Sequence, residues 1–312
     1  MCTAVSVTAG DHYFGRNLDY EYDFGEKIVI TPRKYEFKFQ NGEATGEHYA
    51  IIGMALPKND YPLYFDAANE AGLSVAGLNF PHFARYNHKR EGKTNIASYE
   101  FIPWVLTNCS TVDGAKKLLE NLSVTDDAFD ESTPPTPLHW LISDRERSIT
   151  VEQTQKGLFV YDNPVGVLTN SPTFDFHLFY LNNYLSLSCE EPQNTFSEKL
   201  SLAPYSRGMG GIGLPGDLSS QSRFVRAAFT SLNSVWESGE NERVHQFFHI
   251  LQSVAQTKGC ARVEGEFEMT NYSSCINTDK GIYYYATYYN QAISKVEMHT
   301  ENLDGENLII KP

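Results

Sequence analysis

The order of the predicted strands and helices constrains the fold of this chain more strongly than any single motif. Alternating and β-branched patterns predict strands over residues 3–8, 12–18, 27–31, 49–54, 63–66, 73–79, 138–143, 148–154, 158–161, 165–168, 267–271, 274–277, 281–288 and 293–299. Helical periodicity predicts helices over residues 98–107, 112–119, 222–235 and 241–256. Strands, two helices, strands, two helices and strands follow one another. This grouping favours an α+β fold with two sheets packed face to face and helices outside, rather than alternating βαβ units.

The chain has no break at which two domains would separate. Its 312 residues suggest roughly two domains on length alone, but no internal repeat and no long linker divides them. We therefore expect a single domain over residues 1–312. Two loops interrupt the predicted elements. Residues 123–137 are acidic and contain prolines, and residues 189–217 form an excursion that includes the glycine-rich run 208–216.

The second residue, Cys2, carries the strongest chemical signal. Methionine aminopeptidases remove an initiator methionine when the next side chain is small, so the mature chain would begin with Cys2. Such a residue has a thiol of pKa about 8.5 and a free α-amino group of pKa about 7.7–8.0. The amine is able to take the thiol proton near neutral pH, so nucleophile and base lie in one residue. A cysteine after a start methionine means little alone, and the residues downstream decide its meaning.

The predicted hairpin of residues 3–8 and 12–18 brings two charged side chains, Arg16 and Asp19, back toward Cys2. A cation beside a thiol favours the thiolate, and a carboxylate beside an N-terminal amine fixes its orientation. An ordinary surface ion pair is the alternative. Positions 16 and 19 differ by an odd number, so one regular strand cannot present both on one face. We expect the strand to end before Asp19 rather than to bulge.

Four blocks of sequence resemble the choloylglycine hydrolase family, which contains bile salt hydrolases and penicillin V acylases. The blocks are Cys2-Thr3-Ala4 with Tyr13-Phe14-Gly15-Arg16-Asn17-Leu18-Asp19, Gly77-Leu78-Asn79-Phe80-Pro81, Leu168-Thr169-Asn170-Ser171-Pro172, and Gly213-Leu214-Pro215-Gly216-Asp217 running into Ser222-Arg223-Phe224-Val225-Arg226. They agree with the family in order and approximate spacing and span nearly the whole chain. Together they are far more specific than any one block.

The resemblance implies an N-terminal nucleophile hydrolase with a four-layer αββα sandwich. By motif position Cys2 is then the nucleophile, and Arg16 and Asp19 contact its sulfur and its amine. The sulfur would attack an amide carbonyl, and the α-amine would pass the proton to the leaving amine. Water would release the acid from the resulting thioester.

Three further residues follow from the same resemblance. Asn79 and Asn170 would help to hold the N-terminus and form the oxyanion hole, and Arg223 would be the further charged member of the site. A developing oxyanion needs such preorganised donors, and the loss of one typically costs about 10²–10³ in turnover. The resemblance implies no metal and no organic cofactor.

Position 79 also bears on the substrate. Bile salt hydrolases resemble this chain in having Asn at the position of Asn79, whereas many penicillin V acylases have Tyr there. Together with Phe80-Pro81 this favours glycine- and taurine-conjugated bile salts. The steroid needs a broad apolar trough, which loops near 20–24, 63–65 and 123–138 would line. A penicillin V acylase on the same scaffold is the first alternative, and a non-catalytic bile-acid or lipid-binding protein is a more distant one.

The composition argues against several classes of partner. Asp and Glu number 39 against 25 Lys and Arg, and no basic cluster interrupts the net charge of −14, so nucleic acid and anionic membrane surfaces are not expected. No apolar run approaches the ~20 residues of a membrane span, and the N-terminus lacks a signal-peptide pattern. Five cysteines at unrelated spacings indicate free thiols in a reducing compartment, and we expect a cytoplasmic protein. The resemblance adds a homotetramer, assembled with the help of the 189–217 excursion.

Two other motifs are weak evidence for a dinucleotide site and for a metal site. Residues 208–213 match GxGxxG, but they follow no clear strand and have no acidic ribose partner, so we expect no dinucleotide site. His245 and His249 have the spacing of metal ligands on a helix, but Gln246 stands where a zinc protease has Glu, and no third ligand is evident. The four cysteines other than Cys2 lack a nucleophile-like setting, and free cysteines are commonly buried in the core.

Overall fold

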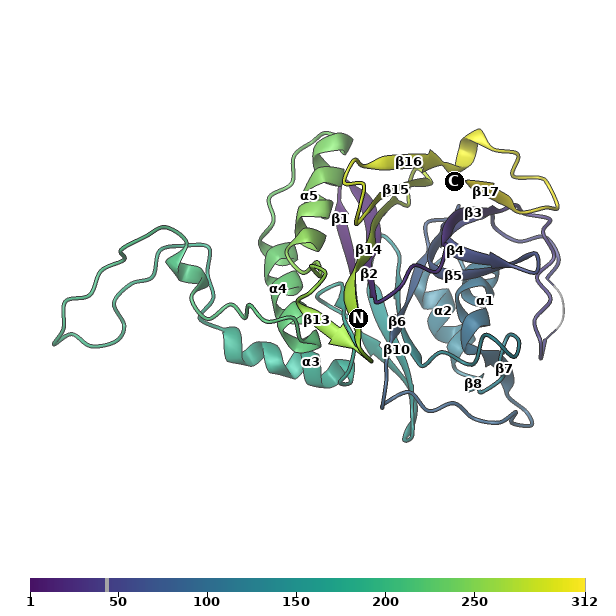
Figure 1. Cartoon of the computed structure of the whole chain (residues 1–312), viewed down its shortest axis with the longest axis horizontal. Coiled ribbons are helices and arrows are strands. Elements are labelled where there is room, and N and C mark those ends of the chain that lie inside the picture. Colours follow the sequence, from purple (N-terminus) through teal and green to yellow (C-terminus); the bar gives the residue numbers. More distant parts are fainter. Residues whose placement is uncertain (43–44, 312) are drawn as a thin grey trace.

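The computed structural model describes residues 1–42 and 45–311, which form two β-sheets packed between two layers of helices (Figure 1). Sheet one contains β1 Cys2–Ala9, β2 Asp11–Tyr20, β12 Val167–Leu168, β13 Ala261–Val263, β14 Glu266–Asn277, β15 Ile282–Thr287 and β16 Ser294–Glu297. Its strand order is β12-β1-β2-β14-β15-β16, and β13 pairs with β14 beside this path. All of these pairs are antiparallel.

Sheet two lies against sheet one and is antiparallel throughout. It contains β3 Lys27–Thr31, β4 Ile51–Lys58, β5 Tyr61–Asn69, β6 Ser74–Asn79, β9 Leu138–Ser143, β10 Ser148–Thr154, β11 Gly157–Asp162 and β17 Ile309–Lys311. Its strand order is β11-β10-β9-β6-β5-β4-β3-β17. A separate short parallel pair joins β7 Thr94–Ala97 to β8 Leu122–Thr125.

Helices cover the outer face of each sheet. On sheet two, α1 Phe101–Asn108 packs against β5 and β6, and α2 Val112–Leu119 packs against α1. On sheet one, α4 Ser220–Asn233 packs against β1, and α5 Glu240–Gln252 packs against β14, β1 and β2. The shorter α3 Phe174–Tyr180 follows β12. The expected four-layer αββα sandwich is therefore confirmed (Figure 1).

Sheet two is buried on both faces because successive residues of its strands enter different cores. Ile51 and Val75 belong to the core shared with α1 and α2, whereas their neighbours Ile52 and Ala76 belong to the core shared with sheet one. Side chains alternate along a strand, so a strand between two cores is apolar at nearly every position. The central strands of sheet two therefore show continuous apolar runs.

Helix α4 carries a charged residue on its buried face. Ser219 is the N-cap, and its Oγ accepts a hydrogen bond from the backbone N–H of Ser222. One turn further on, Arg223 and Ala227 both lie on the face that packs against sheet one, and both are fully buried. The same apolar packing that places α4 on the sheet therefore delivers a guanidinium to the start of β1.

Several sequence-based predictions of local structure are wrong. The strand predicted to end before Asp19 continues to Tyr20. The loop predicted over 123–137 begins inside a strand, because β8 runs to Thr125. No element was expected at β7, β13, β17 or α3, which are short and lack a long periodic pattern. That residues 1–312 form one domain stays a prediction.

The excursion over residues 189–217 extends away from the four layers (Figure 1). Its only helical element is a single 3₁₀ turn, Met209–Gly211. The GxGxxG pattern lies on this segment and follows no strand. Among the residues that the structure describes, no helix is both long and apolar enough to cross a membrane.

The turn of the first hairpin is tied to the rest of the molecule by His12. This fully buried ring has Nε2 at 3.0 Å from Ser6 Oγ and Nδ1 at 2.8 Å from Thr278 Oγ1. Desolvation by burial lowers the pKa of His12 to about 4, from 6.5. His12 is therefore neutral in the folded chain at pH values where the unfolded chain binds a proton.

Stability should therefore depend on pH through His12. The unfolded state binds the additional proton between pH 6.5 and about 4, so the free energy of unfolding should fall as the pH falls through this window. His12→Asn should reduce the slope in this window by up to about 1.4 kcal/mol per pH unit. Urea unfolding at stepped pH measures the slope, with the exposed His88→Asn as control. Equal slopes for wild type and His12→Asn would contradict the assignment.

Candidate active site

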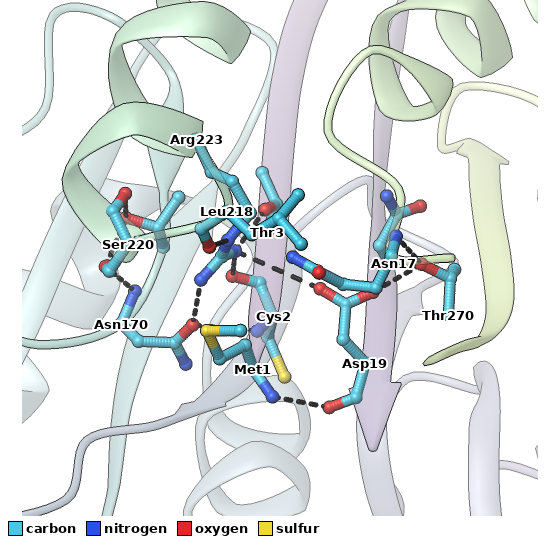
Figure 2. Close-up of polar contacts among 12 residues, drawn as sticks. Met1, Cys2, Thr3, Asn17, Asp19, Asn170, Leu218, Ser220, Arg223 and Thr270 are labelled. Atoms are coloured by element: carbon cyan, nitrogen blue, oxygen red, sulfur yellow. Dashed lines mark hydrogen bonds and ion pairs between the residues drawn. The ribbon is translucent and has the colours of Figure 1, made fainter. Parts of the chain in front are cut away.

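The first residues of β1 extend past the end of its neighbouring strand β12. Cys2 lies opposite Leu18 of β2, but β12 pairs only with Ala4 and Val5 and ends at Leu168. The segment after β12 replaces the missing ladder with a side chain. The backbone N–H of Cys2 donates to Oδ1 of Asn170 at 2.8 Å (Figure 2).

Arg223 closes this arrangement from the helix layer. Its Nη1 donates to the carbonyl oxygen of Cys2 and, at 2.7 Å, to Thr3 Oγ1, while Nη2 donates to Asn170 Oδ1 at 2.7 Å (Figure 2). Burial lowers the pKa of Arg223, and the negative charges of Asp19 and Cys2 oppose that shift. An arginine stays charged in proteins, so a fixed cation lies beside the N-terminus.

Arg16 and Asp19 approach the N-terminus from opposite faces of sheet one. The Nη1 of Arg16 donates to the carbonyl oxygens of Phe65 and Gly77 in sheet two, so Arg16 lies between the sheets. Asp19 lies on the helix side, where Oδ2 is 3.9 Å from Nη1 of Arg223. The odd spacing of 16 and 19 therefore needs no break in β2, because the two side chains never share a face.

Each of these buried charges has an environment that shifts its titration. Burial raises the pKa of Asp19, and Arg223 and a hydrogen bond from Thr270 Oγ1 at 2.6 Å oppose the shift. For Arg16, burial alone would lower the pKa, but electrostatic interactions with Cys2, Tyr272 and Asp66 outweigh it and raise the pKa. Both side chains are inaccessible to solvent, so their charges are compensated only by neighbouring protein groups.

Asp66 is the counter-charge between the sheets that the sequence did not reveal. Its carboxylate accepts hydrogen bonds from Tyr272 OH at 2.5 Å, Tyr283 OH at 2.7 Å and Ser274 Oγ at 3.1 Å. Burial raises the pKa of Asp66, and Arg16 is the largest opposing influence. Arg16 Nη2 has no hydrogen-bond partner among the described residues. Because Cys2 and Arg16 extend from the same face of paired strands, a donor remains free beside the thiol.

Asn79 and Asn170 have different surroundings. Both ends of the Asn170 amide are used, because Oδ1 accepts from Cys2 and Arg223 and Nδ2 donates to the carbonyl oxygen of Asn79 at 2.7 Å. The side-chain amide of Asn79 has no such partner within the described part of the chain, and Asn79 is half-buried. Asn170 is therefore fixed as a support of the N-terminus, and Asn79 keeps a free N–H donor.

A second group of buried side chains fixes the backbone around Asn170. His177 Nε2 lies 2.9 Å from the Asn170 carbonyl oxygen, and the Asn170 N–H donates to Ser220 Oγ at 2.8 Å. His139 lies with Nε2 2.9 Å from the Thr169 carbonyl oxygen and Nδ1 3.0 Å from Glu152 Oε1. These residues were not found from sequence, because each lies outside the four matching blocks.

Met1 occupies the end of the hairpin in this chain. Its carbonyl accepts from the Asp19 N–H at 2.9 Å, and its ammonium group donates to the Asp19 carbonyl oxygen at 2.6 Å and to the buried carboxylate of Glu268 (Figure 2 shows the contact with Asp19). Burial lowers the pKa of the Met1 amine. While Met1 is present, the nitrogen of Cys2 is an amide and has no basic lone pair.

Aromatic rings line the chain next to Asp19. Tyr20 and Phe24 have ring centroids 4.7 Å apart, and Phe24 and Phe65 have centroids 5.4 Å apart. Tyr22, with its ring centroid 4.8 Å from that of Tyr20, is 52% exposed. Two of the segments expected to line an apolar trough, 20–24 and 63–65, therefore meet in one aromatic cluster, although 63–65 lies within β5 and not in a loop.

The other residues considered from sequence lie apart from this site. His249 Nδ1 is 3.2 Å from Gln252 Oε1 on the surface of α5. The residues that the structure describes contain no cluster of three or more His, Cys, Asp or Glu side chains that could hold a metal ion. A cavity of about 670 Å³, lined by Ser6, Thr8 and Trp236 among others, opens at the far end of β1 and includes none of the six predicted site residues.

Comparison with known proteins gives matches over the full chain. The pattern of the family described as linear amide C–N hydrolases, choloylglycine hydrolase family, matches residues 2–311. A bile salt hydrolase/transferase from Lactiplantibacillus plantarum is 53% identical, over 100% of this chain and 97% of that protein. A protein of the same description from Clostridium perfringens is 43% identical, over 99% and 95%.

Solved structures agree with these matches. The C2A mutant of the conjugated bile acid hydrolase from Clostridium perfringens has a TM-score of 0.92 at 41% identity, over 100% of this chain and 97% of that one. A penicillin V acylase from Agrobacterium tumefaciens shares the fold, with a TM-score of 0.77 at 20% identity over 99% and 90%.

The layered sheets and the full-length matches together define a hydrolase with the N-terminal nucleophile fold. The chain belongs to the choloylglycine hydrolase family of linear amide C–N hydrolases. The resemblance drawn from four blocks of sequence is thereby confirmed.

Proposed function

We propose that this chain hydrolyses the amide bond of glycine- and taurine-conjugated bile salts, with Cys2 as the nucleophile. The observation that carries the proposal is the convergence of one thiol and its charged and amide neighbours on the start of β1: Cys2, Arg16, Asp19, Asn79, Asn170 and Arg223. Relatives at 40–53% identity are named as hydrolases of bile salts or conjugated bile acids, which supports the substrate class.

The first step forms a thioester. Once Met1 is removed, the α-amine of Cys2 takes the proton of the thiol, and the sulfur attacks the amide carbonyl of the substrate. The guanidinium of Arg16, whose Nη2 has no hydrogen-bond partner among the described residues, would stabilise negative charge that develops on the sulfur. Asn170 and Arg223 hold the nitrogen and the carbonyl of Cys2, so the nucleophile keeps one orientation during the attack.

The tetrahedral intermediate needs donors aimed at its oxyanion. We assign one of them to Asn79 from its place in the matching block; its carbonyl accepts from Asn170 Nδ2 at 2.7 Å, and its side-chain amide has no protein acceptor in the described chain. As the intermediate collapses, the α-ammonium of Cys2 gives its proton to the departing glycine or taurine nitrogen. Water then attacks the thioester, and the same amine takes the water proton. These steps use only groups of the chain and water.

The steroid would lie on the aromatic cluster formed by Tyr20, Tyr22, Phe24 and Phe65. Tyr20 is the last residue of β2, Tyr22 and Phe24 follow that strand, and Phe65 lies on β5, where its carbonyl accepts from Arg16. An exposed ring such as Tyr22 offers an apolar face to a large substrate while the outer side of that substrate stays in water. This places the apolar part of the substrate beside the carbonyl that is attacked.

Cys2→Ser should abolish turnover of conjugated bile salts. A serine hydroxyl is a weaker nucleophile than a thiolate in this setting, so release of taurine from taurocholate and of glycine from glycocholate should fall to below about a thousandth of wild type. Amino-acid release and the mass of an acyl-enzyme measure the effect, with penicillin V as the competing substrate. The matched control is Cys109→Ser, at the end of α1 on the far side of sheet two, which should keep its turnover. Turnover of penicillin V alone would overturn the substrate assignment.

A chain that retains Met1 should be nearly inactive. Its Cys2 nitrogen is an amide that donates to Asn170, so no general base is present, although the other five residues are in place. The comparison is between protein with and without Met1, each verified by intact mass, in the taurocholate assay. Equal rates for the two forms would contradict the role of the α-amine.

We also propose that the chain acts in the cytoplasm as a homotetramer, without nucleic-acid or membrane partners. Support for self-association comes from large apolar side chains on and next to the 189–217 excursion that water contacts in the single chain. They are Leu185, Phe196, Leu200, Leu202, Tyr205 and Ile212. Exposed apolar surface of this kind on a segment that extends from the body is typical of a protein–protein contact.

Self-association should weaken when this surface is made charged. Analytical ultracentrifugation of wild type should give the mass of a tetramer, and Phe196→Asp with Tyr205→Asp should give smaller species, because buried carboxylates without partners are strongly unfavourable. Glu198→Asp, a conservative change at a charged position of the same segment, is the control. A monomeric wild type would overturn the proposed tetramer.

A further inference from the structure

The outermost strand of sheet two, β11, has one edge without a neighbouring strand, because it pairs with β10 alone. Just past the strand, the N–H of Asn163 donates to the carbonyl oxygen of Ser148 at 2.9 Å. Hydrogen-bonded pairs alternate along an antiparallel ladder. Phe159 therefore bonds to β10, whereas the backbone N–H and C=O groups of Leu158 and Val160 point outward. No backbone group of the described residues bonds to these outward groups.

The other edges of the two sheets are short or charged. β17 has three residues and ends in Lys311, β12 has two residues, and β16 carries Lys295 and Glu297. In contrast, β11 has six residues, and its residues 157–161 include neither a charged side chain nor a proline. Native proteins protect strand edges by shortness, charge or proline, because an unprotected edge readily pairs with a further strand. β11 lacks all three protections.

The layers on both sides of β11 leave room for the side chains of an added strand. Toward α2, a cavity of about 530 Å³ is lined by Leu119, Leu158 and Val160 among others. Toward α3, a second cavity of about 360 Å³ is lined by Tyr161 and by Phe179, which is 73% exposed. Successive side chains of a strand point to opposite faces. A strand added to β11 would therefore direct its side chains alternately toward the two cavities.

The backbone of β11 is complementary to a second copy of itself. If two copies pair antiparallel about a two-fold axis at Phe159, the outward-pointing residues of one copy meet those of the other. Leu158 of one copy then lies opposite Val160 of the second copy, and each of these pairs exchanges two hydrogen bonds. Apolar side chains that lie opposite each other on one face stabilise a sheet.

The charges at the two ends of β11 favour the same register. Lys156, which is exposed, then lies opposite Asp162 of the second copy. Asp162 already accepts from Lys116 at 3.1 Å and from Arg147 at 2.5 Å, but its side chain is still 65% exposed. A shift of the register by two residues in either direction removes this pair of opposite charges. The occupant that matches the edge is therefore the same strand of another copy.

We propose that β11 is a self-association surface, on which a second copy of this chain adds its own β11 in antiparallel orientation and continues sheet two across a two-fold axis. The inference deepens the proposed homotetramer and rests on it. A tetramer of D2 symmetry contains two different two-fold interfaces. The contact proposed for the 189–217 excursion is one of them, and β11 supplies the other.

Val160→Pro should weaken this pairing and keep the fold. The outward N–H of Val160 donates across the axis once from each copy, and proline lacks this donor. Proline is tolerated where the N–H of an edge strand faces outward, so the ladder to β10 stays in place. In the Phe196→Asp, Tyr205→Asp background the dissociation constant of the remaining dimer should rise at least about tenfold. Sedimentation over a concentration series measures this constant, and circular dichroism verifies folding. Val160→Thr, which keeps the N–H, is the control.

A cysteine at position 159 tests the register. On the axis, Phe159 lies opposite itself in a pair without hydrogen bonds, with Cα atoms about 4.5 Å apart, which is within the range that a disulfide spans. With the exposed Cys189 and Cys260 changed to Ser, Phe159→Cys should give a disulfide-linked dimer in oxidised glutathione. Tyr161→Cys, on the same face, should give none, because the two thiols would be displaced by four residues, about 13 Å, along the strand. Peptide mass spectrometry locates the link.

The outcomes separate this surface from the proposed tetramer. Cross-linking at position 159 alone, with a weaker interface in Val160→Pro, supports the pairing. Equal cross-linking at positions 159 and 161, or equal dissociation constants for Val160→Pro and Val160→Thr, overturns it. If Val160→Pro does not fold, the two cysteine variants decide. A monomeric wild type overturns the tetramer and this surface together, whereas a tetramer without a cross-link at position 159 overturns this surface alone.

Discussion

The position of the N-terminus depends on one guanidinium, that of Arg223. Its donors reach the Cys2 carbonyl, Thr3 Oγ1, the Asn170 side chain and the Leu218 carbonyl, so it joins β1, the segment after β12 and the start of α4. Because β12 ends at Leu168, the first residues of β1 pair with β2 on one side and have no strand beside them on the other. A planar fork of several donors replaces that ladder, which a lysine with a single ammonium group would not do. The orientation of Cys2 therefore depends on the packing of α4 against the sheet.

Buried charges around the site occur as compensated sets on both sides of sheet one. Arg16 and Asp66 lie between the sheets, and Arg223 and Asp19 lie under the helices. Removal of one member would leave its partner buried and uncompensated, which costs more than the pair contributes. Among the described residues, Arg16 keeps one donor, Nη2, without a hydrogen-bond partner on the face from which Cys2 extends. Negative charge that develops on the Cys2 sulfur in the proposed chemistry would lie on the same face of sheet one as this guanidinium.

Sequence patterns predicted the layers of this fold and the family. They also named Cys2 and five residues to act with it, whose roles stay predictions. The strands and the α1, α2, α4 and α5 helices have clear periodicity, and the four blocks identify the family. The parity argument about Arg16 and Asp19 led to a wrong strand end, because it assumed that both side chains serve the N-terminus from one face. The register between β1 and β2, and the packing of sheet one between sheet two and the helices, decide which face each side chain occupies. The periodicity of a single sequence does not reveal this register or this packing.

The residues missed by sequence share a physical reason. Asp66, His177 and Glu268 lie in none of the four matching blocks, and the local sequence around a polar residue does not distinguish a satisfied core residue from one near a site. What makes them informative is a partner far along the chain: Arg16 for Asp66, Asn170 for His177 and the N-terminus for Glu268. Only the fold brings these segments together.

Met1 links the assembly of the site to its use. Met1 and Asp19 exchange two backbone hydrogen bonds, so Met1 extends the β1–β2 ladder by one pair and its ammonium compensates Glu268. Cleavage of Met1 gives up that pair and frees the Asp19 N–H, the Asp19 carbonyl and the Glu268 carboxylate beside the nucleophile. The start of β1 keeps its place because Asn170 and Arg223 bind Cys2 and Thr3, not Met1. In the proposed mechanism Met1 must leave to create the base, and the contacts that hold Cys2 and Thr3 do not depend on it.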